Sequence, residues 1–243
     1  YEEARALWQA AGERREEANT LNTIGEVYQQ LSEPRTALRY YDQALRLSQE
    51  VNDRRGEAQV LNGISSVYLS LSENQKALDS CTRALTLSQA VGHRRGEAQA
   101  LNNIGEVYYY FGNFQKALDY YHQALPIWLA LSDRRGQAET LLFFAYSYAG
   151  LGDAQGALDY SKQALSLWRA VNDLRGQAHT LIVIGHLYSI LGEKQEALNL
   201  YNQAMPLFQS MGDQLGKART LDGMGYVYDE LGDKQRAIEY YLQ

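Results

Sequence analysis

Residues 101–125 read LNNIGEVYYYFGNFQKALDYYHQAL, and this stretch decides the fold. Its first half carries residues at the spacing i, i+3, i+4, i+7, which marks one face of an α-helix: Leu101, Ile104, Gly105 and Tyr108. Gly112 then suits the left-handed residue that ends a helix, and Asn113 suits the N-cap of the next one. The second half continues at helical spacing with Ala117, Leu118, Tyr121, Ala124 and Leu125. The stretch therefore predicts a hairpin of two helices, helix A and helix B.

This hairpin pattern returns at one fixed interval along the whole chain, without insertion or deletion. The residues that open each phrase are Leu21, Leu61, Leu101, Leu141, Leu181 and Leu221. A fixed period of this size is typical of a solenoid, in which each unit buries its apolar face against its neighbours. We expect one array over residues 1–243. It comprises a partial helix B and linker at 1–17, full repeats at 18–57, 58–97, 98–137, 138–177 and 178–217, and a truncated repeat at 218–243.

These residues resemble the tetratricopeptide repeat, in which helix A carries Leu-Gly and Tyr and helix B carries Ala, an aromatic residue and Ala. The interval from Leu61 to Leu101 is longer than the usual period of about 34 residues. The longer form is similar to the repeats of GoLoco-binding spindle adaptors, of bacterial proteins associated with CHAT proteases and of kinesin light chains. The resemblance implies an all-α fold, a right-handed superhelix (an α-solenoid) of antiparallel helical hairpins.

The recurring tyrosines of helix A, such as Tyr28 and Tyr108, are predicted to pack in the core and to fill the gaps between successive hairpins. An aromatic residue at helical spacing in a repeat favours a packing role over a role in a site.

Composition and charge argue against several classes of function. The formal net charge of −6 gives no electrostatic reason to expect nucleic acid or an anionic membrane. No apolar run approaches the roughly 20 residues of a membrane-spanning helix. Cys81 is the only cysteine and occupies the helix B position of Tyr41 and Tyr121, which predicts a small buried thiol. We find no catalytic constellation, no cofactor motif and no metal motif, so we expect a cytoplasmic protein that is not an enzyme.

The segments between repeats combine an acidic residue with a pair of arginines, as in Asp53-Arg54-Arg55. The aspartates at the equivalent positions are predicted N-caps of helix A: Asp53, Asp133, Asp173 and Asp213. We expect the arginines to pair with acidic residues of adjacent hairpins.

In tetratricopeptide superhelices the concave groove is lined mainly by helix A residues beside the packing face, and these positions vary freely between the repeats of this chain. The candidate peptide-binding residues transferred in this way are Asn22, Glu26, Asn62, Asn102, Glu106, Tyr109, Leu142, Tyr146, Ile182 and His186. An asparagine amide both donates to and accepts from a peptide backbone. We therefore expect amides in the early repeats to hold a peptide, and apolar or aromatic residues in the later repeats to seat an anchor.

The expected partner is a protein or peptide that is neutral to basic rather than acidic-tailed, because Glu26, Glu106 and Asp222 lie in these rows. Two alternatives remain. The chain could be the regulatory or sensor arm of a larger multidomain enzyme or signalling protein, such as a CHAT-type protease. Alternatively, it could self-associate head to tail, because Leu231, Ile238 and Tyr241 have no following hairpin to cover them.

Overall fold

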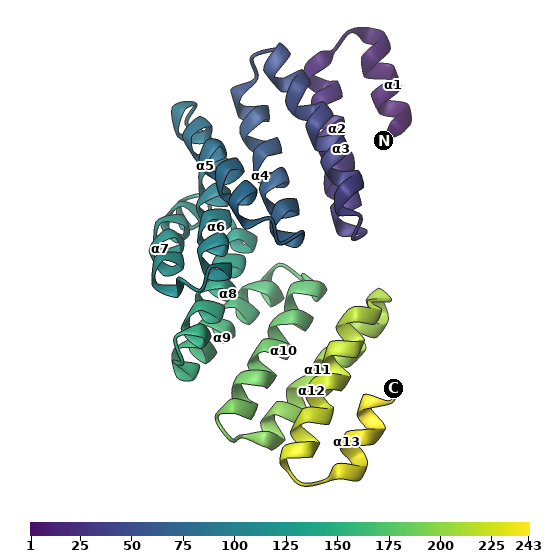
Figure 1. Ribbon diagram of the computed structural model, residues 1–243, viewed down its shortest axis with the longest axis vertical. Helices are drawn as coiled ribbons and strands as arrows, with labels where there is room; N and C mark the ends of the chain where they lie inside the picture. Colours follow the sequence, from purple (N-terminus) through teal and green to yellow (C-terminus); the bar gives the residue numbers. More distant parts are fainter. The chain divides into compact units, whose positions relative to one another are not determined.

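The computed structural model describes residues 1–243 as thirteen α-helices with no strand (Figure 1). The chain divides into two compact units, residues 1–131 and 132–243. Unit 1 contains α1 (Glu2–Ala11), α2 (Arg14–Gln30), α3 (Pro34–Glu50), α4 (Arg54–Ser70), α5 (Asn74–Ala90), α6 (Arg94–Tyr110) and α7 (Phe114–Ala130). Unit 2 contains α8 (Arg134–Gly150), α9 (Ala154–Ala170), α10 (Leu174–Ile190), α11 (Lys194–Met211), α12 (Gln214–Glu230) and α13 (Lys234–Tyr241). The predicted all-α fold of helical hairpins is confirmed.

Each hairpin closes through a tight turn that the sequence signals. Gly112 has φ +73°, in the left-handed region that favours glycine, and its N–H donates to the carbonyl of Tyr109 at 2.9 Å. Asn113 caps α7, since its Oδ1 accepts from the backbone N–H of Lys116 at 3.2 Å. The Arg-Arg-Gly residues between hairpins lie in the first turn of α4, α6 and α8 rather than in the loop, so α4 begins at Arg54, ahead of the predicted repeat boundary at 58.

Side-chain volumes in the core are matched across helices. The ring of Tyr41 on α3 is fully buried and lies between Gly25 on α2 and Gly63 on α4. A Cβ atom at either glycine would lie 2.7 Å from a ring carbon, closer than van der Waals contact allows. Where helix B carries Cys81 instead of tyrosine, helix A carries Ser65. Small residues on helix A therefore accompany large residues on helix B.

A second set of tyrosines stacks within hairpins. Tyr28 on α2 stacks on Tyr40 on α3, with ring centroids 5.3 Å apart and ring planes 9° apart. The same pair recurs at Tyr108 and Tyr120 with a centroid distance of 5.5 Å. The sequence pattern predicts that this row fills the gaps between successive hairpins. At these two places the rings join the two helices of one hairpin, because the B helix presents an aromatic residue opposite. Tyr188, which has Leu200 opposite it, instead contacts the preceding hairpin, where Lys162 Nζ lies 5.2 Å from its ring centroid.

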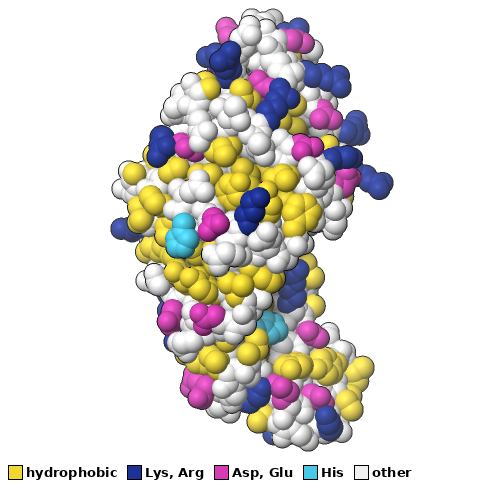
Figure 2. Space-filling view, turned by 60° about the vertical axis from the view of Figure 1, so that its left-hand side comes forward, with side chains coloured by type: hydrophobic (Ala, Val, Ile, Leu, Met, Phe, Trp, Pro, Cys, Tyr) yellow, Lys and Arg dark blue, Asp and Glu magenta, His cyan; other side chains and the backbone are white.

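Acidic and basic side chains lie close together on parts of the surface (Figure 2). Figure 2 shows Lys and Arg side chains projecting from the N-terminal helices at the top of the view, interspersed with acidic ones. Some of these charges join adjacent hairpins, as in the ion pair between Arg15 Nε on α2 and Oδ2 of Asp53, which precedes α4, at 3.0 Å. None of the helices combines the length and the hydropathy that crossing a bilayer requires.

Candidate functional site

The A helices of unit 1 enclose a cavity of about 340 Å³, which we call the α4 cavity. Its lining comes from α2, α3, α4, α6 and α7 and from His93, which precedes α6. The side chains and backbone that line it are Glu26, Gln29, Tyr41, Arg55, Gln59, Asn62, Gly63, Ser66, His93, Arg95, Gly96, Gln99 and Trp128. A volume of this size falls within the range that binding sites for small ligands and side chains commonly have.

The predicted asparagines are buried between neighbouring A helices rather than exposed to solvent. The exposed fraction is 5% for Asn22, 6% for Asn62 and 0% for Asn102. Asn62 Nδ2 donates to the backbone carbonyl of Gly96 on the next A helix at 3.0 Å, and Asn103 Nδ2 donates to the carbonyl of Asn62 at 3.1 Å. The donor half of Asn62 is therefore used within the protein.

The acceptor half of the same amide is not used. Asn62 Oδ1 is buried and accepts no hydrogen bond, and the same holds for Asn22 Oδ1. A buried acceptor without a donor costs about 1–3 kcal/mol, so it favours any ligand that brings an N–H group. The amide of Asn62 thus retains an acceptor without a partner.

Among the residues that line the α4 cavity, Glu26 carries a negative charge, and Glu26 and Tyr41 both form side-chain hydrogen bonds. Glu26 is exposed, and its Oε1 accepts from Asn22 Nδ2 at 2.8 Å. The hydroxyl of Tyr41 donates to Gln29 Oε1 at 3.1 Å. Burial, followed by the charge of Glu26, raises the pKa of Tyr41, so this hydroxyl remains a donor at neutral pH.

The remaining candidates of unit 1 lie near the end of α6. Glu106 and Tyr109 are half-buried. The ring of Tyr109 contacts the rings of Tyr110 and Phe114, with centroid distances of 5.6 and 5.5 Å. Tyr110 is 56% exposed, and it is not among the predicted site residues. This group is an aromatic surface on α6 and α7.

The candidates of unit 2 fall into buried and accessible residues. Leu142 and Tyr146 on α8 are half-buried, whereas Ile182 on α10 is only 7% exposed and belongs to the core. His186 is exposed on one side and packs edge-on against the ring of Tyr201, with centroids 5.7 Å apart. Desolvation of the imidazole lowers the pKa of His186, so this side chain is neutral at pH 7. An apolar anchor would therefore meet Leu142, Tyr146 and His186 rather than Ile182.

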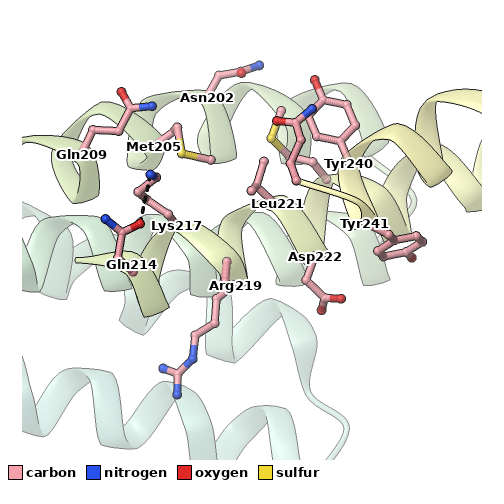
Figure 3. A pocket seen from close by; sticks show the side chains of 13 residues that line it. Asn202, Met205, Gln209, Gln214, Lys217, Arg219, Leu221, Asp222, Tyr240 and Tyr241 are labelled. Carbon is pink, nitrogen blue, oxygen red and sulfur yellow. Dashed lines mark hydrogen bonds between the residues drawn. The ribbon is translucent and has the colours of Figure 1, made fainter. Parts of the chain in front are cut away.

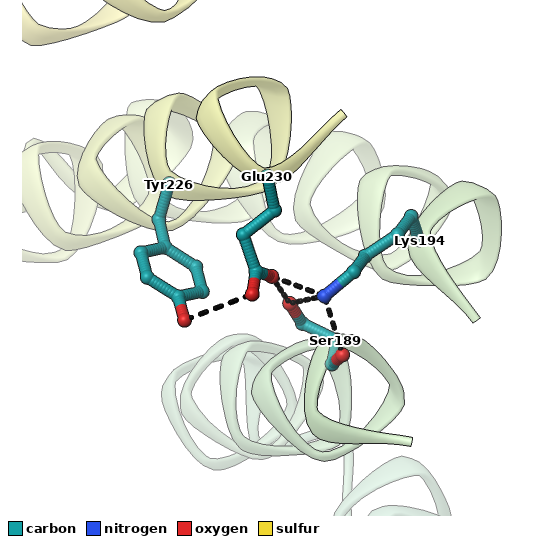
Figure 4. Close-up of polar contacts among 4 residues, drawn as sticks. All are labelled: Ser189, Lys194, Tyr226 and Glu230. Atoms are coloured by element: carbon teal, nitrogen blue, oxygen red, sulfur yellow. Dashed lines mark hydrogen bonds and ion pairs between the residues drawn. The ribbon is translucent and has the colours of Figure 1, made fainter. Parts of the chain in front are cut away.

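Part of the variable face of unit 2 is committed to holding hairpins together. Lys194 forms an ion pair with Glu230 and donates to the carbonyl of Ser189 at 2.7 Å, as Figure 4 shows. Ser189 Oγ donates to Glu230 Oε2 at 3.2 Å, and the Tyr226 hydroxyl donates to Glu230 Oε1 at 3.1 Å. The hydrogen bond from Lys194 is the main cause that lowers the pKa of Glu230. The network joins α10, α11 and α12.

A cavity of about 860 Å³ lies beside α12, between α11 and α13, and contains Met205, Leu221 and Tyr240 (Figure 3). In the preceding hairpin the second half of helix B packs at this place, where Phe208 contacts His179 edge-on at 5.2 Å. Helix α13 ends at Tyr241, so no such residue covers Arg219, the equivalent of His179. The size of this cavity reflects the length of α13.

Several residues of the α4 cavity are not predicted from the sequence. Gln59 and Gln99 lie one turn before the predicted rows, in a row that also varies between repeats. Arg55, in the first turn of α4, and His93, at the N-cap of α6, belong to the sequence segments between repeats, to which the sequence pattern assigns only capping and pairing roles. The signal in the sequence is His93 itself, because it stands where the equivalent linkers carry Asp53, Asp133, Asp173 and Asp213.

The buried thiol of Cys81 has 0% exposure, as predicted, and burial raises its pKa to about 12. No group of three or more His, Cys, Asp or Glu side chains is arranged to hold a metal ion.

Comparison with known families agrees with this architecture. One model of the tetratricopeptide repeat matches residues 1–50, 56–130 and 136–210, and a second model of the same repeat matches residues 218–243. The chain belongs to the tetratricopeptide repeat family. No curated protein sequence matches it significantly.

Solved structures share the fold at low sequence identity. A Rap protein complexed with competence and sporulation factor has a TM-score of 0.75 and 16% identity, covering 94% of this chain and 73% of that one. BtubC from P. vanneervenii has a TM-score of 0.68 and 21% identity, covering 87% of each chain. A signal-transduction ATPase with a tetratricopeptide repeat sensor from Pyrococcus horikoshii has a TM-score of 0.69 and 17% identity, covering 94% of this chain and 36% of that one.

Proposed function

We propose that this chain is a non-catalytic scaffold that binds a peptide or helical segment of a partner protein on the variable face of its A helices. The observation that carries the proposal is the α4 cavity, in which Asn62 Oδ1 is a buried acceptor without a donor. A peptide backbone supplies N–H groups, and its side chains fill cavities of this size. The Rap conjugation gene regulator of the plasmid pLS20, which shares the fold with a TM-score of 0.75 at 15% identity, was solved in complex with the Phr* peptide, and this supports peptide binding as a use of such an array.

We further propose that the partner segment is neutral or basic overall. Glu26 at the α4 cavity and Asp222 and Asp229 on α12 place negative charge on the variable face of each unit. The protein as a whole carries a net charge of −6. Strongly acidic tails would be repelled by these charges, whereas a basic segment would be attracted.

A cavity-filling variant tests this function. Gln59 lines the cavity and is exposed, so Gln59→Trp fills the cavity without entering the core. Gln75→Trp on the exposed face of α5 is the matched control. Peptides selected by the wild-type protein from a random display library should bind Gln59→Trp at least about 10-fold more weakly, which corresponds to about 1.4 kcal/mol. Equal affinity for wild type and Gln59→Trp, or failure of the wild type to select any peptide, would overturn the proposal.

A second candidate is a sensor arm within a larger signalling protein or enzyme, such as a CHAT-type protease. The similarity to the ATPase with a tetratricopeptide repeat sensor favours it, since this chain covers 36% of that protein. A domain with catalytic residues in the same reading frame would support this candidate, and its absence from the complete frame would remove it.

Head-to-tail self-association is a third candidate, because large apolar side chains are exposed at both ends of the chain. Leu7 is 70% exposed, Ile238 is 53% exposed and Leu242 is 82% exposed. Light scattering over a concentration series should then show a mass that rises with concentration. A constant monomer mass would refute this candidate.

A further inference from the structure

At two of the linkers the aspartate that precedes an A helix has two interactions. Asp53 Oδ1 accepts from the backbone N–H of Gly56 at 3.0 Å, and its Oδ2 lies 3.0 Å from Arg15 Nε. At another linker Asp173 Oδ1 accepts from the N–H of Gly176 at 2.9 Å, and its Oδ2 lies 2.8 Å from Arg135 Nη2. One carboxylate thus caps the helix and neutralises the second arginine of the preceding linker.

This arrangement is broken at the start of α6, where His93 takes the place of aspartate. His93 makes no capping hydrogen bond, and its Nδ1 is buried without a hydrogen-bond partner. Arg55 is the second arginine of the preceding linker, in the place that Arg15 and Arg135 hold at theirs, and it forms no ion pair. The carboxylate found at this position in the equivalent linkers is therefore absent before α6. The positive charge of Arg55 has no acidic partner there.

The unpaired arginine faces open space. Arg55, His93 and Arg95 line the α4 cavity, and the same three residues line a neighbouring cavity of about 370 Å³ that Val91 and Leu131 close on its apolar side. The α4 cavity therefore has a basic end at Arg55 and an acidic end at Glu26. An acidic group can reach Arg55 from solvent without displacing core residues.

A second group in the same cavity indicates what carries that acidic group. Asn62 is 6% exposed, lines the α4 cavity and has the unpartnered acceptor Oδ1. Asn62 lies two turns after Arg55 on α4, which corresponds to about 10 Å along the helix axis. An extended peptide spans this separation with about three residues. The ligand thus combines an anionic group with an N–H donor about three residues away.

We infer that the peptide bound in the α4 cavity carries an aspartate or glutamate whose carboxylate pairs with Arg55 beside His93, while a backbone N–H about three residues away donates to Asn62 Oδ1. The inference rests on the proposed peptide-binding function and adds a requirement to it. The ligand carboxylate takes the place that Asp53 and Asp173 fill at their own linkers. A single acid at a fixed position is compatible with a segment that is neutral or basic overall.

Two substitutions and one control test this requirement. Arg55→Gln removes the cation, whereas His93→Asp supplies the missing carboxylate from within the chain, so it should cap α6, pair with Arg55 and raise Tm. Arg54→Gln is the matched control, because Arg54 is equally exposed and lines neither cavity. All three substituted positions are outside the core, and circular dichroism with thermal melts verifies folding.

The probe is a random peptide library displayed on messenger RNA, selected on each protein. Wild type and Arg54→Gln should enrich peptides with Asp or Glu at one fixed position, and exchanging that acid for its amide should weaken binding about 10-fold, as expected for the loss of a charge-assisted hydrogen bond. Arg55→Gln and His93→Asp should show no such preference. Enriched peptides without a fixed acid, or an acid preference that persists in Arg55→Gln, would overturn this inference and leave peptide binding standing. If wild type enriches no peptide, both this inference and the proposed function fail.

Discussion

Adding one methyl group at Gly25 tests the volume matching between helices. The new Cβ would lie 2.7 Å from Cε1 of Tyr41, whereas unstrained carbon atoms stay about 3.5–4.0 Å apart. Gly63 confines the ring on its other side, where an added Cβ would also lie 2.7 Å from a ring carbon. Overpacking of this kind costs about 1–3 kcal/mol, and replacing a helical glycine by alanine returns about 0.5–1 kcal/mol. We expect Gly25→Ala to destabilise the protein by about 1–2 kcal/mol.

The assay is urea denaturation and thermal melting of four proteins in a double-mutant cycle. For a chain of this size, 1 kcal/mol lowers Tm by about 2–4 °C, so Gly25→Ala should lower it by about 2–8 °C. Tyr41→Ser alone should cost about 3–5 kcal/mol through the lost ring. In the Tyr41→Ser background the same Gly25→Ala change should become stabilising, by about 0.5–1 kcal/mol. The natural hairpin with Ala145 opposite Ser161 has this combination.

Either of two results would refute this reasoning. Helix propensity alone predicts that Gly25→Ala raises Tm in the wild-type background, and an observed rise would mean that the contact with Tyr41 is not restrictive. An equal cost in the wild-type and Tyr41→Ser backgrounds would mean that the strain comes from somewhere other than the ring.

Three further outcomes follow from single residues. Asp173→Ala removes the cap on Gly176 and should lower stability by about 0.5–2 kcal/mol, measured by urea denaturation, whereas loss of an exposed charge alone would cost less than about 1 kcal/mol. Burial, followed by the charge of Asp133, raises the pKa of Glu139 from 4.5 to about 7. The folded protein therefore holds this proton more tightly than the unfolded chain, and stability should fall as the pH rises from about 4.5 to about 7. Glu139→Gln should flatten that part of the Tm–pH curve, and an unchanged slope would contradict the assignment. The buried thiol of Cys81, whose pKa is about 12, should resist a thiol reagent at about pH 8 until denaturant is added, and rapid labelling of the native protein would show that the core around it opens.

The hairpins themselves could be predicted because their signals are local. The helical spacing of Leu101, Ile104 and Tyr108 requires only neighbouring turns of one helix, and Gly112 and Asn113 specify the turn through their own backbone preferences. The capping role of Asp53, Asp133, Asp173 and Asp213 is local in the same sense, and the hydrogen bonds confirm it.

The environment of the candidate site residues could not be predicted from such local signals. The sequence places Asn62 beside the packing face of its own helix. Its burial, however, depends on how closely α6 approaches α4, and no pattern within one helix specifies that distance. The α4 cavity likewise depends on side chains from five helices, including Trp128 at the end of α7. The absence of an acid at His93 is visible in the sequence, yet its meaning requires the ion pair between Arg135 and Asp173 as a reference.

The clamping of Tyr41 between Gly25 and Gly63 constrains how such arrays can be rearranged by recombination. A crossover in the linker before Arg54 would separate Tyr41 from Gly63, and the incoming hairpin would then have to bring a residue at that place that leaves room for the ring. The residue at the equivalent sequence position is Gly223 for Tyr201 but Phe143 for Tyr121, so the fit belongs to each pair of neighbouring hairpins. The heritable module of this protein is therefore longer than the visible repeat and overlaps the next one.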